Sequence, residues 1–154
     1  MNHFGSKIVG QAYRERVGAY AVAFDEKGCV ALVEAPAFRN GEPWLFLPGG
    51  GIEQSESHEE CILRECLEET GCTVQVDEYI GEADEYLTSL KIKEYMHLTG
   101  HFYRVHWGEK VQKSIEEDHT LLWVPVEQCY KRMFCKYQIW AVKTAWEKEK
   151  EKKI

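Results

Sequence analysis

The chain has 154 residues, of which 44% are hydrophobic and 29% are charged. This size and composition predict one globular domain over 1–154 with a single sizeable core, and they leave little room for a second domain. The formal net charge of -7 argues against an extended nucleic-acid surface and against charge-driven binding to membranes. We find no apolar stretch typical of a signal peptide and no run as long as a membrane span, so we expect a cytoplasmic protein.

The first half of the chain alternates apolar runs with turn residues. The runs at 17–24 and 29–34 predict two strands, joined by a turn at 25–28. The run at 44–47 predicts a third strand. Pro48 and three glycines follow it directly, so a strand-to-helix loop is predicted at 49–51. Glycine would allow the backbone of this loop to approach a ligand closely.

A helix is predicted over 58–70. Ser57 and Glu60 have the spacing of a capping box, in which a hydroxyl and a carboxylate each bind a backbone N–H group of the first turn. Gly71 suits a left-handed C-cap at the other end. These two signals give the helix a defined beginning and end.

The second half predicts more strands and two further helices. Strands are predicted at 73–86, 96–107 and 120–126, and helices at about 126–131 and from about Cys135. Apolar residues recur at helical spacing in the last helix, so we expect this face in the core: Tyr137, Trp140, Ala141, Thr144 and Ala145. Residues 146–154 are expected to form a solvated helical tail. Strands mixed with a few helices predict an α/β fold in which a mixed sheet is covered on both sides.

The six cysteines show no CxxC spacing, and they fall inside predicted helices and strands. This pattern favours reduced, packed thiols over a disulfide scaffold or a zinc site.

The most informative pattern lies between Gly50 and Cys72. Its fixed residues are Gly50, Glu56, Arg64, Glu65, Glu68, Glu69 and Gly71. At about 100° per residue, the three acids of the helix, Glu65, Glu68 and Glu69, fall on one face, while an apolar set falls on another. One face of the helix is therefore expected to pack, and the other to present three carboxylates.

An acidic helix face is ordinarily a solvated surface, but the charge around this one is unusually one-sided. Between residues 53 and 90 there are twelve acids, and Arg64 is the only lysine or arginine. Like charges one turn apart cost on the order of a few tenths of a kcal/mol per pair, and bound cations would relieve this repulsion. Because the ligands are all oxygens, Mg²⁺ or Mn²⁺ is favoured over zinc.

The pattern resembles the Nudix box, with Cys66 and Cys72 at two positions where an apolar residue belongs. The resemblance implies the α/β/α sandwich of the Nudix hydrolase family. It also implies a metal-dependent hydrolase that cleaves the pyrophosphate bond of a nucleoside di- or triphosphate, or of a nucleoside diphosphate derivative, by attack of a metal-activated water. The implied cofactor is Mg²⁺ or Mn²⁺, and the implied partner is a small-molecule nucleotide. The oligomeric state stays open, with a homodimer as one alternative.

The resemblance also implies roles for individual residues. The carbonyl of Gly49 and the carboxylates of Glu65, Glu68 and Glu69 are the expected metal ligands. Glu65 and Glu69 lie one turn apart, so both can reach one ion, and Glu68 can share a second ion or hold a metal-bound water. Glu65 is the first candidate for the general base. The alternative is an acid of a later loop, chosen from Glu116, Glu117 and Asp118, and among these we favour Glu117.

The remaining motif residues are expected to have mainly structural roles. Arg64 either binds a phosphate during catalysis or forms an ion pair that orients Glu65 and anchors Glu56, and we favour the second role. Gly50 is the motif glycine. Outside the motif, Phe38 and Arg39 are predicted to contact substrate, Phe38 by stacking on a base and Arg39 by binding a phosphate.

Two functions of other classes remain open. A fold does not guarantee chemistry, so the chain is alternatively a non-catalytic domain that senses a nucleotide or a metal. Such a sensor would bind nucleotide with Mg²⁺ and release no phosphate. A purely partner-binding domain, with the acidic helix as its interaction face, is the other alternative, and it would bind no metal.

Overall fold

The structure is a computed structural model that describes residues 1–39, 42–89, 94–116 and 118–152; the side chains at 36–39, 42 and 89 lie outside the description. The strands are β1 (Asn2–Phe4), β2 (Arg14–Val22), β3 (Cys29–Arg39), β4 (Glu42–Phe46), β5 (Gly49–Gly51), β6 (Cys72–Ser89), β7 (Glu94–Lys110) and β8 (Thr120–Pro125). The helices are α1 (His58–Thr70), α2 (Val126–Cys129) and α3 (Lys136–Glu151).

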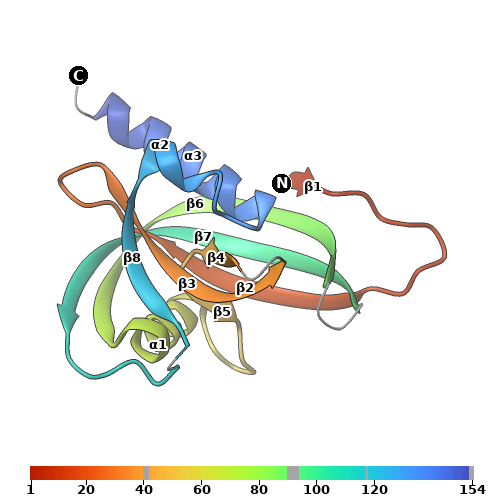
Figure 1. Ribbon diagram of the computed structural model, residues 1–154, viewed down its shortest axis with the longest axis horizontal. Coiled ribbons are helices and arrows are strands. Elements are labelled where there is room, and N and C mark those ends of the chain that lie inside the picture. The colour runs from red at the N-terminus through yellow and green to blue at the C-terminus, as the bar shows by residue number, and fades with distance from the viewer. Residues whose placement is uncertain (40–41, 90–93, 117, 153–154) are drawn as a thin grey trace.

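The strands form two sheets. The larger sheet has five strands in the order β1-β6-β7-β2-β5. The pairs β1–β6 and β2–β7 are parallel, while β6–β7 and β2–β5 are antiparallel, so the predicted mixed sheet is confirmed. The smaller sheet, β4-β3-β8, is antiparallel and was not predicted as a separate layer. Figure 1 shows α3 along one side of the strands and α1 on the other side, as expected for an α/β/α sandwich.

Strand β2 explains why both faces of the larger sheet are covered. Successive side chains of a strand point to opposite faces. Ala19 and Ala21 accordingly join the apolar cluster around α1, while Tyr20 and Val22 join the cluster around α3. One strand therefore contributes to two cores, and each core holds one helix against the sheet.

The predicted loop at 49–51 is instead the short strand β5. Its three glycines pair antiparallel with β2, with Gly50 opposite Ala19. Glycine has no side chain whose alternation would indicate a strand, and β5 forms because β2 lies next to it. The local sequence alone therefore predicted a loop here. Strand β1 was missed for a related reason, because its three residues become a strand only by pairing with β6.

Other predicted elements are confirmed with changed lengths. The turn at 25–28 is present, with the Lys27 N–H group donating to Asp25 Oδ1 at 2.9 Å. The strands predicted at 73–86 and 96–107 are confirmed as the longer β6 and β7. The helix predicted at 126–131 is only one turn long.

The last helix buries three residues of its predicted stripe, Tyr137, Ala141 and Ala145, at no more than 1% exposure, while Trp140 and Thr144 are half-buried. Helix α3 continues to Glu151, and two residues of the expected tail contact the body of the protein. The rings of Trp146 and Phe24 lie 4.9 Å apart between centroids, and Arg104 donates to Glu149 at 2.7 Å. The tail is therefore helical, and it is anchored along part of its length.

All six cysteines lie within described residues, and all are free thiols. Five are buried, and Cys29, in the first residue of β3, is half-buried. Reduced, packed thiols are therefore confirmed. Among the described residues, no helix has both the length and the apolar character needed to cross a bilayer.

Candidate active site

Helix α1 is held firmly at both ends. The predicted capping box is present: Glu60 N–H donates to Ser57 Oγ at 3.0 Å, and Ser57 N–H donates to Glu60 Oε1 at 3.0 Å. Gly71 has the predicted left-handed conformation, with φ of 74°, and its N–H group donates to Leu67 O. A Cβ at Gly71 would fall 2.0 Å from Gln112 O. Both the dihedral angle and the lack of space therefore require glycine at this position.

Three carboxylates converge beside this helix. Oxygens of Glu65, Glu68 and Glu116 all lie within 4.8 Å of one another. Glu65 and Glu68 come from α1, and Glu116 comes from the loop between β7 and β8. Glu117, the later-loop acid favoured from sequence, lies outside the described residues, whereas its neighbour Glu116 is described and is brought to the helix. An all-oxygen donor set of this kind fits a hard divalent cation such as Mg²⁺ or Mn²⁺.

Glu69 lies deeper than the other acids of the motif. It is 8% exposed, and its Oε1 accepts the N–H group of Gly49 at 2.9 Å. Burial raises its pKa to about 8; the Gly49 hydrogen bond opposes this rise, and nearby carboxylates such as Glu65 add to it. Burial also raises the pKa of Glu65. Without a cation, the Glu69 carboxyl group therefore tends to hold its proton at neutral pH.

Gly50 is positioned by β5 directly against the carboxyl group of Glu65. A Cβ at Gly50 would lie 2.7 Å from Glu65 Cδ and Oε1. At Gly49, a Cβ would lie 2.3 Å from the Ala19 carbonyl oxygen, and φ is 140°. The glycines thus allow β5 to lie between β2 and the acidic helix without displacing a carboxylate.

Arg64 uses all of its donors within the protein. A guanidinium group has five N–H bonds. Its Nε and Nη2 atoms donate to the two oxygens of Glu56 at 2.6 and 2.9 Å, and Nη2 also donates to Gly51 O at 3.1 Å. Its Nη1 atom donates to Glu65 Oε1 at 2.9 Å and to Glu68 Oε2 at 3.3 Å. The bond from Arg64 lowers the pKa of Glu56 to about 2.

Because all five N–H groups of Arg64 already have acceptors, the two roles considered for this residue can be compared. The guanidinium joins the loop before α1 to two acids of the helix, so it is placed to orient carboxylates. No N–H group remains for a phosphate unless one of these bonds breaks.

The loop before β8 is attached to the C-terminal end of α1. Ile115 N–H donates to Glu68 O at 2.8 Å, and Ser114 Oγ lies 2.7 Å from Glu69 O. Carbonyls in the last turn of a helix lack partners within the helix, so this loop supplies them. The attachment fixes the backbone of Glu116 relative to Glu65 and Glu68. Ser114 was not identified from sequence, because a serine in a polar loop has no distinctive spacing.

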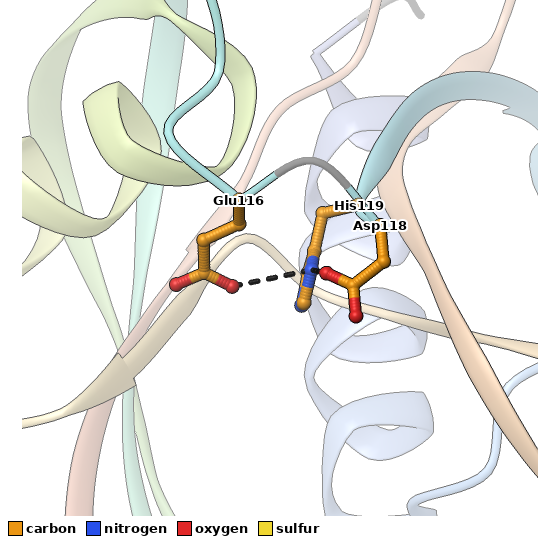
Figure 2. A group of neighbouring side chains, drawn as sticks. All are labelled: Glu116, Asp118 and His119. Atoms are coloured by element: carbon orange, nitrogen blue, oxygen red, sulfur yellow. Dashed lines mark hydrogen bonds and ion pairs between the residues drawn. The ribbon is translucent and has the colours of Figure 1, made fainter.

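His119 is a second residue that sequence analysis did not single out. Figure 2 shows its imidazole between the carboxylates of Glu116 and Asp118. The Nδ1 atom lies 3.2 Å from Glu116 Oε2 and 2.9 Å from Asp118 Oδ1. The side chain is one-fifth exposed.

A cleft of about 470 Å³ is lined by one acid of the motif, Glu69. Gly49, Gly50 and Glu69 line one part of it. Much of the remaining wall is apolar or aromatic, including Phe46, Leu87, Met96, Leu98 and Phe134, while polar groups come from Arg16, Asp118, His119 and Gln138. The predicted contacts Phe38 and Arg39 lie at the end of β3, but their side chains are outside the described part of the structure.

A sequence model of the NUDIX domain matches residues 14–139. The chain belongs to the Nudix family. The matched range includes the acids of α1, the glycine strand β5 and the loop of Glu116, so the whole candidate site lies inside the Nudix domain.

Two curated Nudix relatives match over part of their length. A protein of Bacillus subtilis (strain 168), provisionally named 8-oxo-dGTP diphosphatase, is 38% identical over 64 residues, which are 42% of this chain and 40% of that protein. Nudix hydrolase 21, chloroplastic, of Arabidopsis thaliana is 38% identical over 74 residues, which are 46% of this chain and 36% of that protein. The chain thus spans less than half the length of either relative.

A solved structure supports the fold. The NUDIX hydrolase from Nitrosomonas europaea superposes with a TM-score of 0.71, at 16% identity, over 88% of this chain and 90% of that chain. At this identity the similarity concerns the Nudix architecture alone.

Proposed function

We propose that this Nudix protein is a metal-dependent hydrolase that cleaves the pyrophosphate bond of a nucleoside di- or triphosphate or of a nucleoside diphosphate derivative. The observation that carries the proposal is that oxygens of Glu65, Glu68 and Glu116 lie within 4.8 Å of one another. Gly50 and Glu69, from the same motif as Glu65 and Glu68, line a cleft of about 470 Å³. A cleft of this volume lies within the range of small-molecule sites.

The cation would be held by Glu65, Glu68 and Glu116. Nudix enzymes generally use divalent metals, and the donors here are carboxylate oxygens, which supports Mg²⁺ or Mn²⁺. A divalent cation bound there would lower the pKa of a coordinated water and neutralise phosphate charge. Glu69 and the Gly49 carbonyl stay predicted ligands; Glu69 has one oxygen engaged by the Gly49 N–H group.

Residues of the chain would have separate roles in catalysis. Arg64 holds Glu65 and Glu68 in place through Nη1. A carboxylate serves as general base. Glu65 and Glu116 are both candidates, because both belong to the group of carboxylates that could hold the cation. Arg16 is exposed and lines the cleft, so it is our candidate for a phosphate contact, alongside the predicted Arg39.

The substrate would place its phosphates near the acids and its base along the apolar part of the cleft. The name of the Bacillus subtilis relative supports including oxidised purine nucleotides among the candidate substrates. Phe46 and Phe134 supply aromatic rings in the wall, and a base can stack on such rings irrespective of its identity.

A substrate panel tests the proposal. Purified protein is incubated with nucleoside triphosphates, 8-oxo-dGTP, dinucleoside polyphosphates and nucleotide sugars, with Mg²⁺ or Mn²⁺, and products are separated by chromatography. We expect cleavage of a phosphoanhydride bond that requires the cation and falls at least about 100-fold in Glu68→Gln. Glu109→Gln, which changes an exposed acid of β7, is the matched control.

The panel also separates the other classes of function. Nucleotide and Mn²⁺ binding with no product from any substrate would favour a sensor. Absence of Mn²⁺ binding by calorimetry would favour a partner-binding domain and contradict the metal site.

A further inference from the structure

The loop that carries Glu116 fixes its backbone but leaves its side chain to be ordered by other contacts. Ile115 and Glu116 N–H groups both donate to Glu68 O, at 2.8 and 3.3 Å. A glutamate side chain nevertheless has several rotatable bonds, and ordering it costs rotamer freedom. A carboxylate that must stay beside Glu65 and Glu68, despite their like charge, needs a partner.

His119 is that partner among the described residues. Its backbone N–H group donates to Glu116 O at 3.1 Å, which closes a tight turn and brings the two side chains together. Its Nδ1 atom then lies 3.2 Å from Glu116 Oε2. Carboxylates accept hydrogen bonds and do not donate them, so the hydrogen bond to Asp118 Oδ1 at 2.9 Å places a proton on Nδ1. Glu116 Oε2 lies within ion-pair distance of the same nitrogen. Figure 2 shows one oxygen of Glu116 joined to His119 and the other directed away from it.

We propose that His119 is a positioning residue: it holds one oxygen of Glu116, so that this carboxylate is presented to the Glu65–Glu68 pair. This inference rests on the proposed function, because it assigns a task within the same site. It does not make His119 a ligand or a base. The essential atom is Nδ1, because that atom faces Glu116.

Two amide substitutions distinguish the nitrogen atoms of the ring. In asparagine the amide nitrogen is attached at Cγ, as Nδ1 is in histidine, whereas in glutamine it lies one bond further out, close to the place of Nε2. His119→Asn therefore keeps a donor towards Glu116, and His119→Gln removes it. We expect His119→Gln to lower kcat about 10- to 100-fold, the usual effect of losing a residue that orients a ligand, with little change in KM. We expect His119→Asn to retain most of the rate.

A double-mutant cycle tests whether the effect passes through Glu116. If it does, His119→Gln adds little further loss in a Glu116→Gln background, because the group that it orients is already changed. The matched control is His106→Gln, since His106 also pairs with a carboxylate, Asp77 at 3.0 Å, and is largely exposed on β7. Thermal unfolding confirms that each variant is folded.

Calorimetric titration with Mn²⁺ provides a readout that does not depend on hydrolysis. We expect weaker Mn²⁺ binding in His119→Gln and near wild-type binding in His119→Asn. Equal losses in both variants would indicate that the imidazole itself is a ligand, and wild-type behaviour of both would remove any role; either result overturns the proposal. If the wild type cleaves no nucleotide, the proposed function fails, but the Mn²⁺ titration still decides the role of His119.

Discussion

Gly50 and Glu65 are in contact, backbone against carboxyl group, so that a Cβ at Gly50 would lie 2.7 Å from Glu65 Oε1. Real Cβ atoms do not approach other heavy atoms this closely. The glycine of the motif is thus explained by the space that the Glu65 carboxyl group occupies. Strand β5 and helix α1 can lie together only while this position has no side chain.

Gly50→Ala should therefore displace the Glu65 carboxyl group. We expect kcat to fall at least about 10-fold, because a misplacement of about 1 Å at a reacting centre is costly, and Mn²⁺ affinity to fall with it. Steady-state kinetics and calorimetry measure both. Gly10→Ala is the control for a glycine change outside the site: φ there is 88°, so alanine is strained, but a Cβ would meet no atom within 4 Å. Wild-type kinetics in Gly50→Ala would show that Glu65 can move without consequence.

Arg64→Lys tests whether this arginine positions carboxylates or binds a phosphate. Lysine retains the charge but cannot serve five acceptors in a planar arrangement. If Arg64 acts on Glu65 and Glu68, kcat should fall by about 10- to 100-fold with KM almost unchanged. A raised KM with an unchanged kcat would instead assign it to the phosphate. Arg132→Lys, at a more exposed pair with Glu34, is the control.

The free energy of unfolding of the metal-free protein should decrease as the pH rises from about 5 to about 8. Burial raises the pKa of Glu69 to about 8, against about 4.3 in an unfolded chain. The folded state therefore binds the Glu69 proton more tightly, and stability is lost as the unfolded state ionises first. Each pKa unit corresponds to about 1.4 kcal/mol, so the total is on the order of a few kcal/mol.

Urea unfolding in the presence of a chelator, at several pH values, measures this dependence. The raised pKa of Glu65 acts in the same direction. Glu69→Gln should flatten the profile over this range, whereas Glu109→Gln should leave it as in the wild type. A wild-type profile that rises between pH 5 and 8 would contradict the burial argument.

Arg16→Ala should raise KM for a nucleotide substrate more than it lowers kcat. The guanidinium lines the cleft beside Gly51, where a Cβ would lie 3.0 Å from Arg16 Nε, and no ion pair joins it to any described residue. A charge-assisted bond to a phosphate is worth about 1.5 to 3 kcal/mol, or roughly 10- to 100-fold in KM. Arg14→Ala, at an exposed arginine that already pairs with Glu94, is the control. Equal KM values in the two variants would exclude a phosphate contact by Arg16.

The sequence predicted the parts of the site that depend on local spacing. The capping box of Ser57 and Glu60, the left-handed Gly71 and the pair of Arg64 with Glu56 were all predicted, and all are present. Each involves residues within one helix and its flanks, where periodicity determines which side chains meet. The convergence of Glu65 and Glu68 followed from the same geometry.

Features that depend on distant pairing were not predicted. Strand β5 exists because β2 lies next to it, and the loop before β8 is fixed by carbonyl groups at the end of α1. No local pattern distinguishes Ser114 or His119 from ordinary loop residues. Glu116 was one of three neighbouring candidates in that loop, and its approach to Glu65 and Glu68 depends on tertiary contacts that the sequence does not show.

Only one of the six thiols is accessible enough to be labelled selectively in the folded protein. Cys29, beside the β2–β3 turn, is half-buried, whereas the other five are buried, and thiol reagents react with accessible thiolates. A maleimide fluorophore should therefore attach at Cys29 in the folded protein without any engineered cysteine, faster as the pH rises because burial and Asp25 raise the pKa of this thiol. The neighbouring Gly28 lies close to Trp146 of α3, so such a dye would report on the docking of the C-terminal helix while leaving the cleft free for substrate.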